Sequence, residues 1–175
     1  MKTEMIVRGR HYLTGDVCDI GIAKGLIQSI SVPSGSRADL GSEDIWVAPG
    51  LIDIQVNGYE GHCFSSAETT GADAVFVAEK LVNAGVTAFC PTVTTNSFPV
   101  MEQSLRAIAG ACAKNSLARE RIITIHLEGP YISPLDGPRG AHPRDHVRNP
   151  DWDEFTRLQQ AAGGRIGLIT VAPEL

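Results

Sequence analysis

The chain has 175 residues, a formal net charge of −5, 43% hydrophobic residues and 20% charged residues. These values are typical of a globular domain and exclude a mainly disordered chain. No apolar run approaches the roughly 18 residues of a transmembrane helix, no secretory signal is visible, and no basic cluster points to nucleic acid. We therefore expect a cytoplasmic protein that binds neither membranes nor nucleic acid.

Residues 1–48 differ in pattern from the rest. Short apolar runs separated by turn residues predict antiparallel strands at Met5–Val7, Val17–Ile20, Leu26–Val32 and Asp44–Val47, with a loop over Ser34–Ser42. The four cysteines are far apart and form no CxxC pair, which argues against a disulfide scaffold or a zinc ribbon. We expect each to be a reduced, buried thiol: Cys18, Cys63, Cys90 and Cys112.

From residue 49 onward, strand and helix patterns alternate. Strands are expected at Leu51–Val56, Val86–Val93, Ile122–Leu127 and Ile166–Val171. Apolar residues at helical spacing fill the intervals, near Gly71–Ala84, after Ser97-Pro99 and after Asn149-Pro150. Repeated βα units imply an α/β fold with a parallel sheet. An open doubly wound sheet and a (β/α)8 barrel both fit, and four strands would be half of a barrel of about 250 residues.

Ligands of such sheets bind at the carboxyl ends of the strands. Glu128 follows the third strand and could ligate a metal, or could instead cap a helix or pair with an arginine such as Arg139 or Arg144. His126 shares its strand face, as a metal ligand or as a buried hydrogen-bonded support. His142 lies in a long loop after this strand, where a ligand-facing role and simple solvation are both open.

Gln55 and Asn57 end the first strand on one face. Their amides either contact a ligand or bond the backbone, and they are poor transition-metal ligands. Walker A, GxGxxG, GxSxG and HExxH motifs are absent from the sequence.

These segments resemble the N-acetylglucosamine-6-phosphate deacetylases of the amidohydrolase superfamily. The resemblance rests on the following matches in order: Ala48-Pro49-Gly50-Leu51-Ile52-Asp53 with Gln55-Val56-Asn57-Gly58, Pro91–Thr95, His126-Leu127-Glu128-Gly129-Pro130, Gly140-Ala141-His142-Pro143, and Thr170–Glu174. It implies residues 49–175 as the first four βα units of a metal-dependent-hydrolase TIM barrel, preceded by β-sandwich strands in residues 1–48.

The resemblance also implies a reaction, hydrolysis of the N-acetyl group of N-acetylglucosamine 6-phosphate to glucosamine 6-phosphate and acetate. Glu128 would ligate one divalent metal ion, Zn²⁺ first, with Fe²⁺, Mn²⁺ or Co²⁺ as alternatives. Ala141 and His142 would contact the sugar phosphate. Gln55 and Asn57 replace the His-x-His pair of many amidohydrolases, which favours one metal over two.

The resemblance places two further histidine ligands and the catalytic Asp, acting as general base and acid, beyond Leu175. No catalytic acid–base residue is therefore expected in this chain. We expect an N-terminal fragment that is inactive alone, and a homodimer for the full-length enzyme. Two alternatives remain open: another amidohydrolase such as an N-acyl-amino-acid deacylase, and a non-catalytic half-barrel that pairs with itself or with a second chain.

Overall fold

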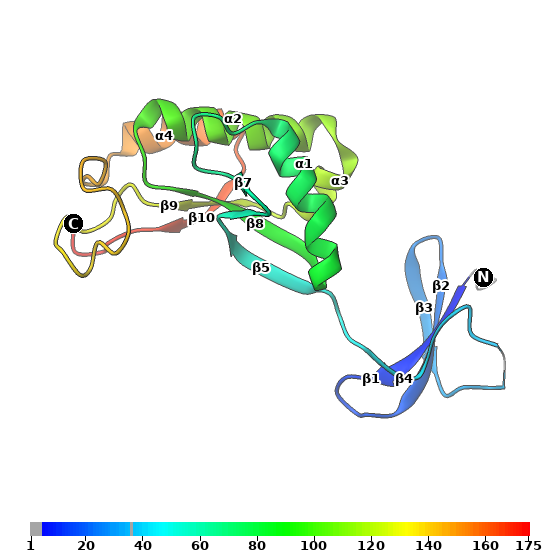
Figure 1. Cartoon of the computed structure of the whole chain (residues 1–175). Helices are drawn as coiled ribbons and strands as arrows, with labels where there is room; N and C mark the ends of the chain where they lie inside the picture. The colour runs from blue at the N-terminus through cyan, green and yellow to red at the C-terminus, as the bar shows by residue number, and fades with distance from the viewer. Residues whose placement is uncertain (1–4, 36) are drawn as a thin grey trace. The chain divides into compact units, whose positions relative to one another are not determined.

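The computed structural model describes residues 5–35 and 37–175. Its backbone contacts divide the chain into two compact units, residues 1–49 and residues 50–175 (Figure 1). None of the described helices is long and apolar enough to cross a membrane.

The first unit is one four-stranded sheet in the described residues. Its strands are β1 (Met5–His11), β2 (Val17–Ala23), β3 (Leu26–Ser31) and β4 (Leu40–Val47), in the order β3-β2-β1-β4. The pairs β1–β2 and β2–β3 are antiparallel, as predicted, but β4 runs parallel to β1. The strand β4 also begins inside the predicted loop. Gly41 permits this, because a Cβ there would lie 2.0 Å from the carbonyl oxygen of Arg8.

The second unit contains a four-stranded parallel sheet. Its strands are β5 (Leu51–Val56), β8 (Val86–Thr94), β9 (Ile125–Glu128) and β10 (Ile166–Thr170), in the order β10-β9-β8-β5. The helices are α1 (Gly71–Lys80), the 3₁₀ turn η1 (Leu81–Ala84), α2 (Phe98–Lys114), α3 (Ser116–Arg121) and α4 (Trp152–Ala161). A two-strand hairpin, β6 (Gly58–Tyr59) and β7 (His62–Cys63), follows β5.

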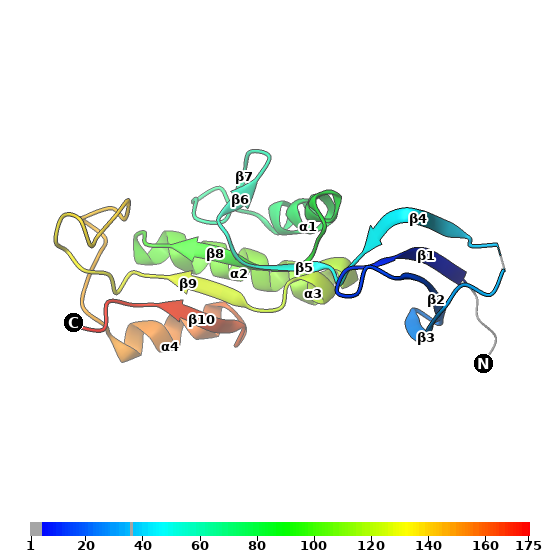
Figure 2. The same cartoon turned by 90° about the horizontal axis from the view of Figure 1, so that it is seen from below.

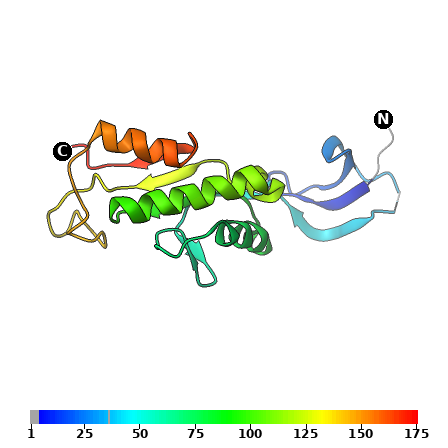
Figure 3. The ribbon, with the colours of Figure 1, turned by 90° about the horizontal axis from the view of Figure 1, so that it is seen from above.

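The helices of this unit lie on one face of the sheet. Figure 1 shows α1, α2, α3 and α4 above the strands, and Figures 2 and 3 show the same layers from below and from above. A doubly wound sheet would carry helices on both faces, whereas a barrel carries them only outside. This arrangement selects half of a (β/α)8 barrel from the two predicted architectures.

The core of the second unit lies between the sheet and the helices. The α2 side chains Met101, Leu105 and Ile108 are fully buried, as are Val93 and Leu127 of the sheet. On β5, Ile52 and Ile54 are 61% and 62% exposed. The strand β5 therefore keeps apolar side chains in contact with solvent.

Local signals placed most element boundaries correctly. Gly85 ends η1 with a φ of 80°, and Pro99 stands in the first turn of α2. The helix predicted to follow Asn149-Pro150 is α4, and Asp151 caps it by accepting a hydrogen bond from the Glu154 N–H over 2.8 Å. The third strand begins at Ile125 rather than at Ile122, which forms only an isolated bridge to Phe89.

The cysteines are free thiols, as predicted. Cys18, Cys90 and Cys112 are buried, and burial raises the pKa of the Cys90 and Cys112 thiols. Cys63 is exposed, so the prediction of a buried side chain there is wrong.

Candidate active site

Three strand ends and one loop meet at a small pocket of about 160 Å³. The strands β5, β8 and β9 bring residues from their carboxyl ends, and the long loop between β9 and α4 closes the pocket. Its lining residues are Asn57, Thr94, Glu128, Ala141, His142 and Pro143. This is the position at which barrels of this kind bind their ligands.

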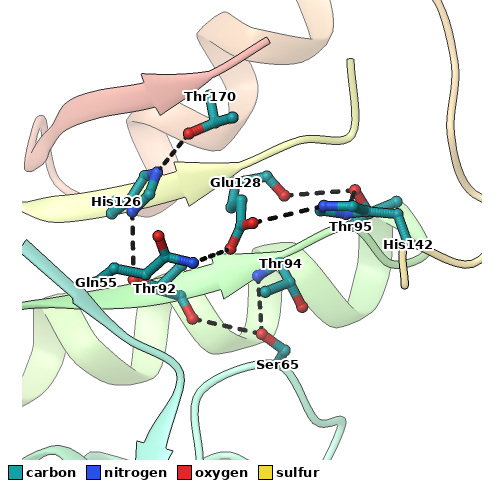
Figure 4. A network of polar contacts seen from close by, with 9 residues as sticks. All are labelled: Gln55, Ser65, Thr92, Thr94, Thr95, His126, Glu128, His142 and Thr170. Atoms are coloured by element: carbon teal, nitrogen blue, oxygen red, sulfur yellow. Dashed lines mark hydrogen bonds and ion pairs between the residues drawn. The ribbon is translucent and has the colours of Figure 1, made fainter. Parts of the chain in front are cut away.

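Glu128 stands at the centre of the polar contacts (Figure 4). Its Oε2 accepts a hydrogen bond from Gln55 Nε2 over 2.9 Å, and its Oε1 lies 3.5 Å from His142 Nε2. The carboxylate therefore caps no helix and pairs with neither arginine considered from the sequence. Arg139 pairs instead with Asp136, at 2.5 Å, and Arg144 is exposed.

His126 is buried behind the pocket rather than lining it. Its Nε2 lies 2.8 Å from Thr170 Oγ1 on β10, and its Nδ1 lies 3.4 Å from Thr92 Oγ1 on β8. Burial lowers the pKa of His126 below its ordinary value, although Glu128 acts to raise it. Both ring nitrogens have protein partners, so His126 ties β9 to its two neighbouring strands just before Glu128.

His142 reaches the pocket from the loop and is held at three points. Its Nδ1 lies 2.8 Å from Thr95 Oγ1, its Nε2 faces Glu128, and its carbonyl oxygen accepts a hydrogen bond from Arg139 Nη1 over 2.7 Å. Farther along the loop, Arg148 Nε bonds both carboxylate oxygens of Glu154, at 3.0 and 2.9 Å. These contacts give a loop without helix or strand a fixed position over the strand ends.

Gln55 and Asn57 reach the same site by different routes. Gln55 directs its amide N–H at Glu128, whereas Asn57 lines the pocket. The backbone of Asn57 is fixed because its carbonyl oxygen accepts a hydrogen bond from the Phe64 N–H over 3.1 Å, which closes the hairpin that follows β5. Gln55 thus orients the carboxylate of Glu128, and neither amide is itself a strong metal ligand.

The donor set at this site fits part of a metal centre. Glu128 offers a carboxylate and His142 an imidazole on facing sides, but the residues that the structure describes contain no group of three or more His, Cys, Asp or Glu able to hold a metal ion. A catalytic zinc ion usually has about three protein ligands. The described residues therefore supply fewer donors than such a centre needs.

Comparison with known proteins gives a consistent result. The chain is 39% identical over 132 residues to an N-acetylglucosamine-6-phosphate deacetylase of Bos taurus, covering 74% of this chain and 31% of that protein. It is 32% identical over 161 residues to the Bacillus subtilis (strain 168) protein of the same name, covering 89% of this chain and 40% of that one. No protein-family model matches the chain.

A solved structure extends the match to the fold. A mutant N-acetyl-D-glucosamine-6-phosphate deacetylase from Mycobacterium smegmatis, in complex with N-acetyl-D-glucosamine-6-phosphate, superposes with a TM-score of 0.81 and 25% identity. The superposition covers 99% of this chain and 44% of that one. Over most of its own length the chain is therefore similar to part of the N-acetylglucosamine-6-phosphate deacetylases.

These matches confirm the resemblance drawn from the sequence and the expected architecture, a TIM-barrel segment with a β-rich N-terminal part. The chain spans about a third of the length of the curated deacetylases it matches, so it carries only part of the deacetylase fold.

Two contributors to this site were not predicted as site residues from the sequence. Thr95 contacts both His142 and Glu128, and Ser65 accepts a hydrogen bond from the Thr94 N–H over 2.8 Å (Figure 4). Hydroxyl residues are common at strand ends and in turns, so nothing distinguishes these two before the loops are folded. Thr95 belongs to the strand-end motif Pro91–Thr95, but its contact with His142 is visible only in the structure.

Proposed function

We propose that the protein containing this chain hydrolyses the N-acetyl group of N-acetylglucosamine 6-phosphate, giving glucosamine 6-phosphate and acetate. The observation that carries the proposal is the placement of Glu128 and His142 across one pocket at the strand ends of a deacetylase-like barrel. The related Mycobacterium smegmatis protein was solved with that sugar phosphate bound. We place the activity in amino-sugar catabolism, in the cytoplasm.

The proposed site takes one divalent metal ion, Zn²⁺ first, with Fe²⁺, Mn²⁺ or Co²⁺ as alternatives. When bound, such an ion polarises the amide carbonyl and lowers the pKa of water. Glu128 is its ligand in this chain, and Gln55 holds the carboxylate in place through its 2.9 Å hydrogen bond. The other ligands, two histidines, and the aspartate that acts as general base and acid come from outside residues 1–175.

The remaining site residues bind and shield the substrate. Ala141 and His142 line the pocket together with Asn57. In the proposed site they contact the N-acetyl sugar. His126 is a supporting residue, since neighbouring strands occupy both of its ring nitrogens. Gln55 and Asn57 stand at the end of β5, in place of the His-x-His pair of many amidohydrolases. Because amides are poor ligands for transition metals, the site takes one metal rather than two. The complete enzyme acts as a homodimer.

A substrate panel tests this function. The complete product of the gene is incubated with N-acetylglucosamine 6-phosphate, unphosphorylated N-acetylglucosamine and N-acetylated amino acids, and acetate release is measured. We expect turnover of the sugar phosphate. Turnover of the amino acids alone would replace the proposal with the N-acyl-amino-acid deacylase alternative. No turnover of any of them, together with stable self-association without metal, would favour a non-catalytic half-barrel.

A further inference from the structure

The loop that carries Ala141 and His142 depends on side chains for its position. Residues 129–151 connect β9 to α4, follow the yellow to orange trace in Figure 1, and contain no helix or strand, although the structure describes all of them. Ordering a segment costs conformational entropy for every residue in it, so a long loop keeps one position only where specific contacts hold it. Ala141 and His142 line the pocket from the middle of this loop. Contacts that fix the ends of the loop therefore fix that wall of the pocket.

Arg148 joins the end of this loop to three other segments. Its Nε donates to both carboxylate oxygens of Glu154, in the first turn of α4, over 3.0 and 2.9 Å. Its Nη1 donates to the carbonyl oxygen of Asn96, which follows β8, over 3.4 Å. Its backbone N–H donates to the carbonyl oxygen of Pro130 over 3.0 Å. The last contact closes residues 130–148 into a ring, and the other two attach that ring to a helix and to a strand end.

The first partner, Glu154, is held independently of Arg148. Its N–H donates to the Asp151 carboxylate over 2.8 Å, in the cap of α4. Tyr131, which is 3% exposed, donates its hydroxyl to the Asp151 carbonyl oxygen over 3.1 Å. Burial and, after it, the nearby Glu154 carboxylate raise the pKa of the Tyr131 hydroxyl. The guanidinium of Arg148 therefore binds a carboxylate that the start of α4 has already fixed.

The second partner, Asn96, links the same guanidinium to another loop at the strand ends. Asn96 Nδ2 donates to the Ser65 carbonyl oxygen over 3.2 Å, and the Ser65 hydroxyl accepts from the Thr94 N–H over 2.8 Å. The loops after β5, β8 and β9 are thus joined in series, and Arg148 makes the connection to the loop after β9. A change at Arg148 releases that loop from two supports and leaves the bonds within each support in place.

The geometry of these contacts calls for an arginine. A guanidinium presents its donors in a rigid plane, so one group can bond the Glu154 carboxylate through Nε and the Asn96 carbonyl through Nη1. The ammonium of a lysine keeps the charge but lacks this fixed fork. The side chains of Arg148 and Glu154 are 29% and 18% exposed, so solvent and salt screen the pair less than they screen a surface pair.

From these contacts we propose that Arg148 is a positioning residue, which holds the loop of residues 129–151 so that Ala141 and His142 stay at the pocket. The described lining residues of the pocket do not include Arg148, so it acts through the loop. That Ala141 and His142 meet the substrate belongs to the proposed function, on which this inference rests. The order of the loop does not require substrate and can be measured without it.

Hydrogen exchange on the 175-residue chain, at low protein concentration, tests the hold on the loop. In Arg148→Lys and Arg148→Met we expect the amides of residues 139–148 to exchange roughly ten times faster than in the wild type, because a charge-assisted hydrogen bond is worth about that factor. The amides of α2 keep their rates. Glu154→Gln breaks the same contact from the other side and serves if Arg148→Met does not fold. Adding Glu154→Gln to an Arg148 variant gives no further acceleration, since both changes remove one contact.

Steady-state kinetics on the complete gene product test the consequence for the pocket. We expect Arg148→Lys to raise KM for N-acetylglucosamine 6-phosphate roughly tenfold and to change kcat far less, because the loop binds substrate while the reacting groups lie elsewhere. The matched control, Arg121→Met, removes another partly buried guanidinium, which donates to the Ala78 carbonyl oxygen over 2.7 Å between α3 and α1. It lowers the melting temperature and leaves both KM and the exchange of residues 139–148 unchanged.

Three results would overturn the inference. The loop amides could exchange no faster in the Arg148 variants, or KM could stay at its wild-type value while they do exchange faster. KM could also rise equally in Arg121→Met, in which case loss of stability alone would account for the change. Failure of the proposed function gives a different result: the wild type releases no acetate from the sugar phosphate, while exchange that still depends on Arg148 supports its hold on the loop.

Discussion

The amide of Gln55 acts on the site through Glu128. We predict that Gln55→Leu in the complete gene product weakens metal binding by roughly tenfold or more, as removal of outer hydrogen bonds to metal ligands commonly does. Competition with a chromogenic chelator measures the affinity. Gln103→Leu is the control, because the side-chain amide of Gln103, in the second turn of α2, donates its hydrogen bond to the backbone of Thr69. Equal loss in both variants would contradict a role for Gln55 at Glu128.

Gly129 gives a second prediction at the scale of one residue. Gly129→Ala should lower the free energy of unfolding by about 1–3 kcal/mol through strain at positive φ, with a further loss because the new Cβ meets Thr95 Oγ1. Gly137→Ala is the control, since Gly137 has a φ of +92° but no atom within 4 Å of a built Cβ. Urea unfolding measures both. A smaller loss of unfolding free energy at position 129 than at 137 would show that the Thr95 side chain moves away from the new Cβ without cost.

Single site residues could be predicted where their position in the sequence already indicates a chemical role. Glu128, His142, Gln55 and Asn57 could be named because each follows a strand end or lies in a long loop, and the structure does bring them together. Thr95 could not be named, since its effect depends on a contact between residues 47 positions apart in the sequence.

At the scale of one element, Asp73 ties the start of α1 to the hairpin before it. Its Oδ2 accepts from the Thr70 N–H and hydroxyl, each over 2.7 Å, and its Oδ1 lies 2.6 Å from His62 Nδ1. Burial acts to raise the pKa of Asp73, but the hydrogen bonds from Thr70 and His62 prevail and hold it below the ordinary value. The ionised form is therefore favoured in the folded protein.

A carboxyl group with a lowered folded pKa stabilises above its unfolded pKa, and the stabilisation is lost as pH falls through the folded value. We predict that Asp73→Ala costs about 1 kcal/mol at pH 7 and clearly less near about pH 3. Urea unfolding at the two pH values gives the difference. Asp153→Ala, in the first turn of α4, is the control. A loss independent of pH would show that the charge of Asp73 contributes nothing.

Long apolar elements could be predicted from sequence, and short polar ones could not. The strands and helices of the second unit were predicted from periodicity, proline and glycine. The helix α3 was missed because its six residues, SLARER, carry little apolar pattern. The hairpin β6–β7 has two residues per strand, too few for any alternation. The parallel pairing of β4 with β1 depends on tertiary contacts, which turn residues in the sequence do not predict.

At the scale of the whole molecule, the open sheet of the second unit governs how the chain behaves in solution. Among the described strands, β5 and β10 each have one unpaired edge, and Ile52 and Ile54 of β5 are largely exposed. Exposed apolar edge strands favour association. We predict that the 175-residue chain self-associates with rising concentration in sedimentation velocity, and that Ile52→Lys with Ile54→Lys reduces this.

The control for that double variant is Leu135→Lys, which changes a loop side chain of 66% exposure. Leu135→Lys should leave self-association unchanged, because a single exposed apolar residue outside an edge strand offers no backbone groups for strand pairing. A monomeric wild-type chain at high concentration would contradict the prediction.

The central claim is that Glu128 holds the metal ion on which deacetylation depends. The most direct measurement titrates Zn²⁺ into the metal-free complete gene product while acetate release from N-acetylglucosamine 6-phosphate and bound metal are followed together. Glu102→Gln, which alters a carboxylate paired with Arg106 on α2, serves as the matched control. We predict that activity rises with one bound ion per chain in the wild type and in Glu102→Gln, and that Glu128→Gln loses both. Full activity in Glu128→Gln, or in the metal-free protein, would contradict the claim.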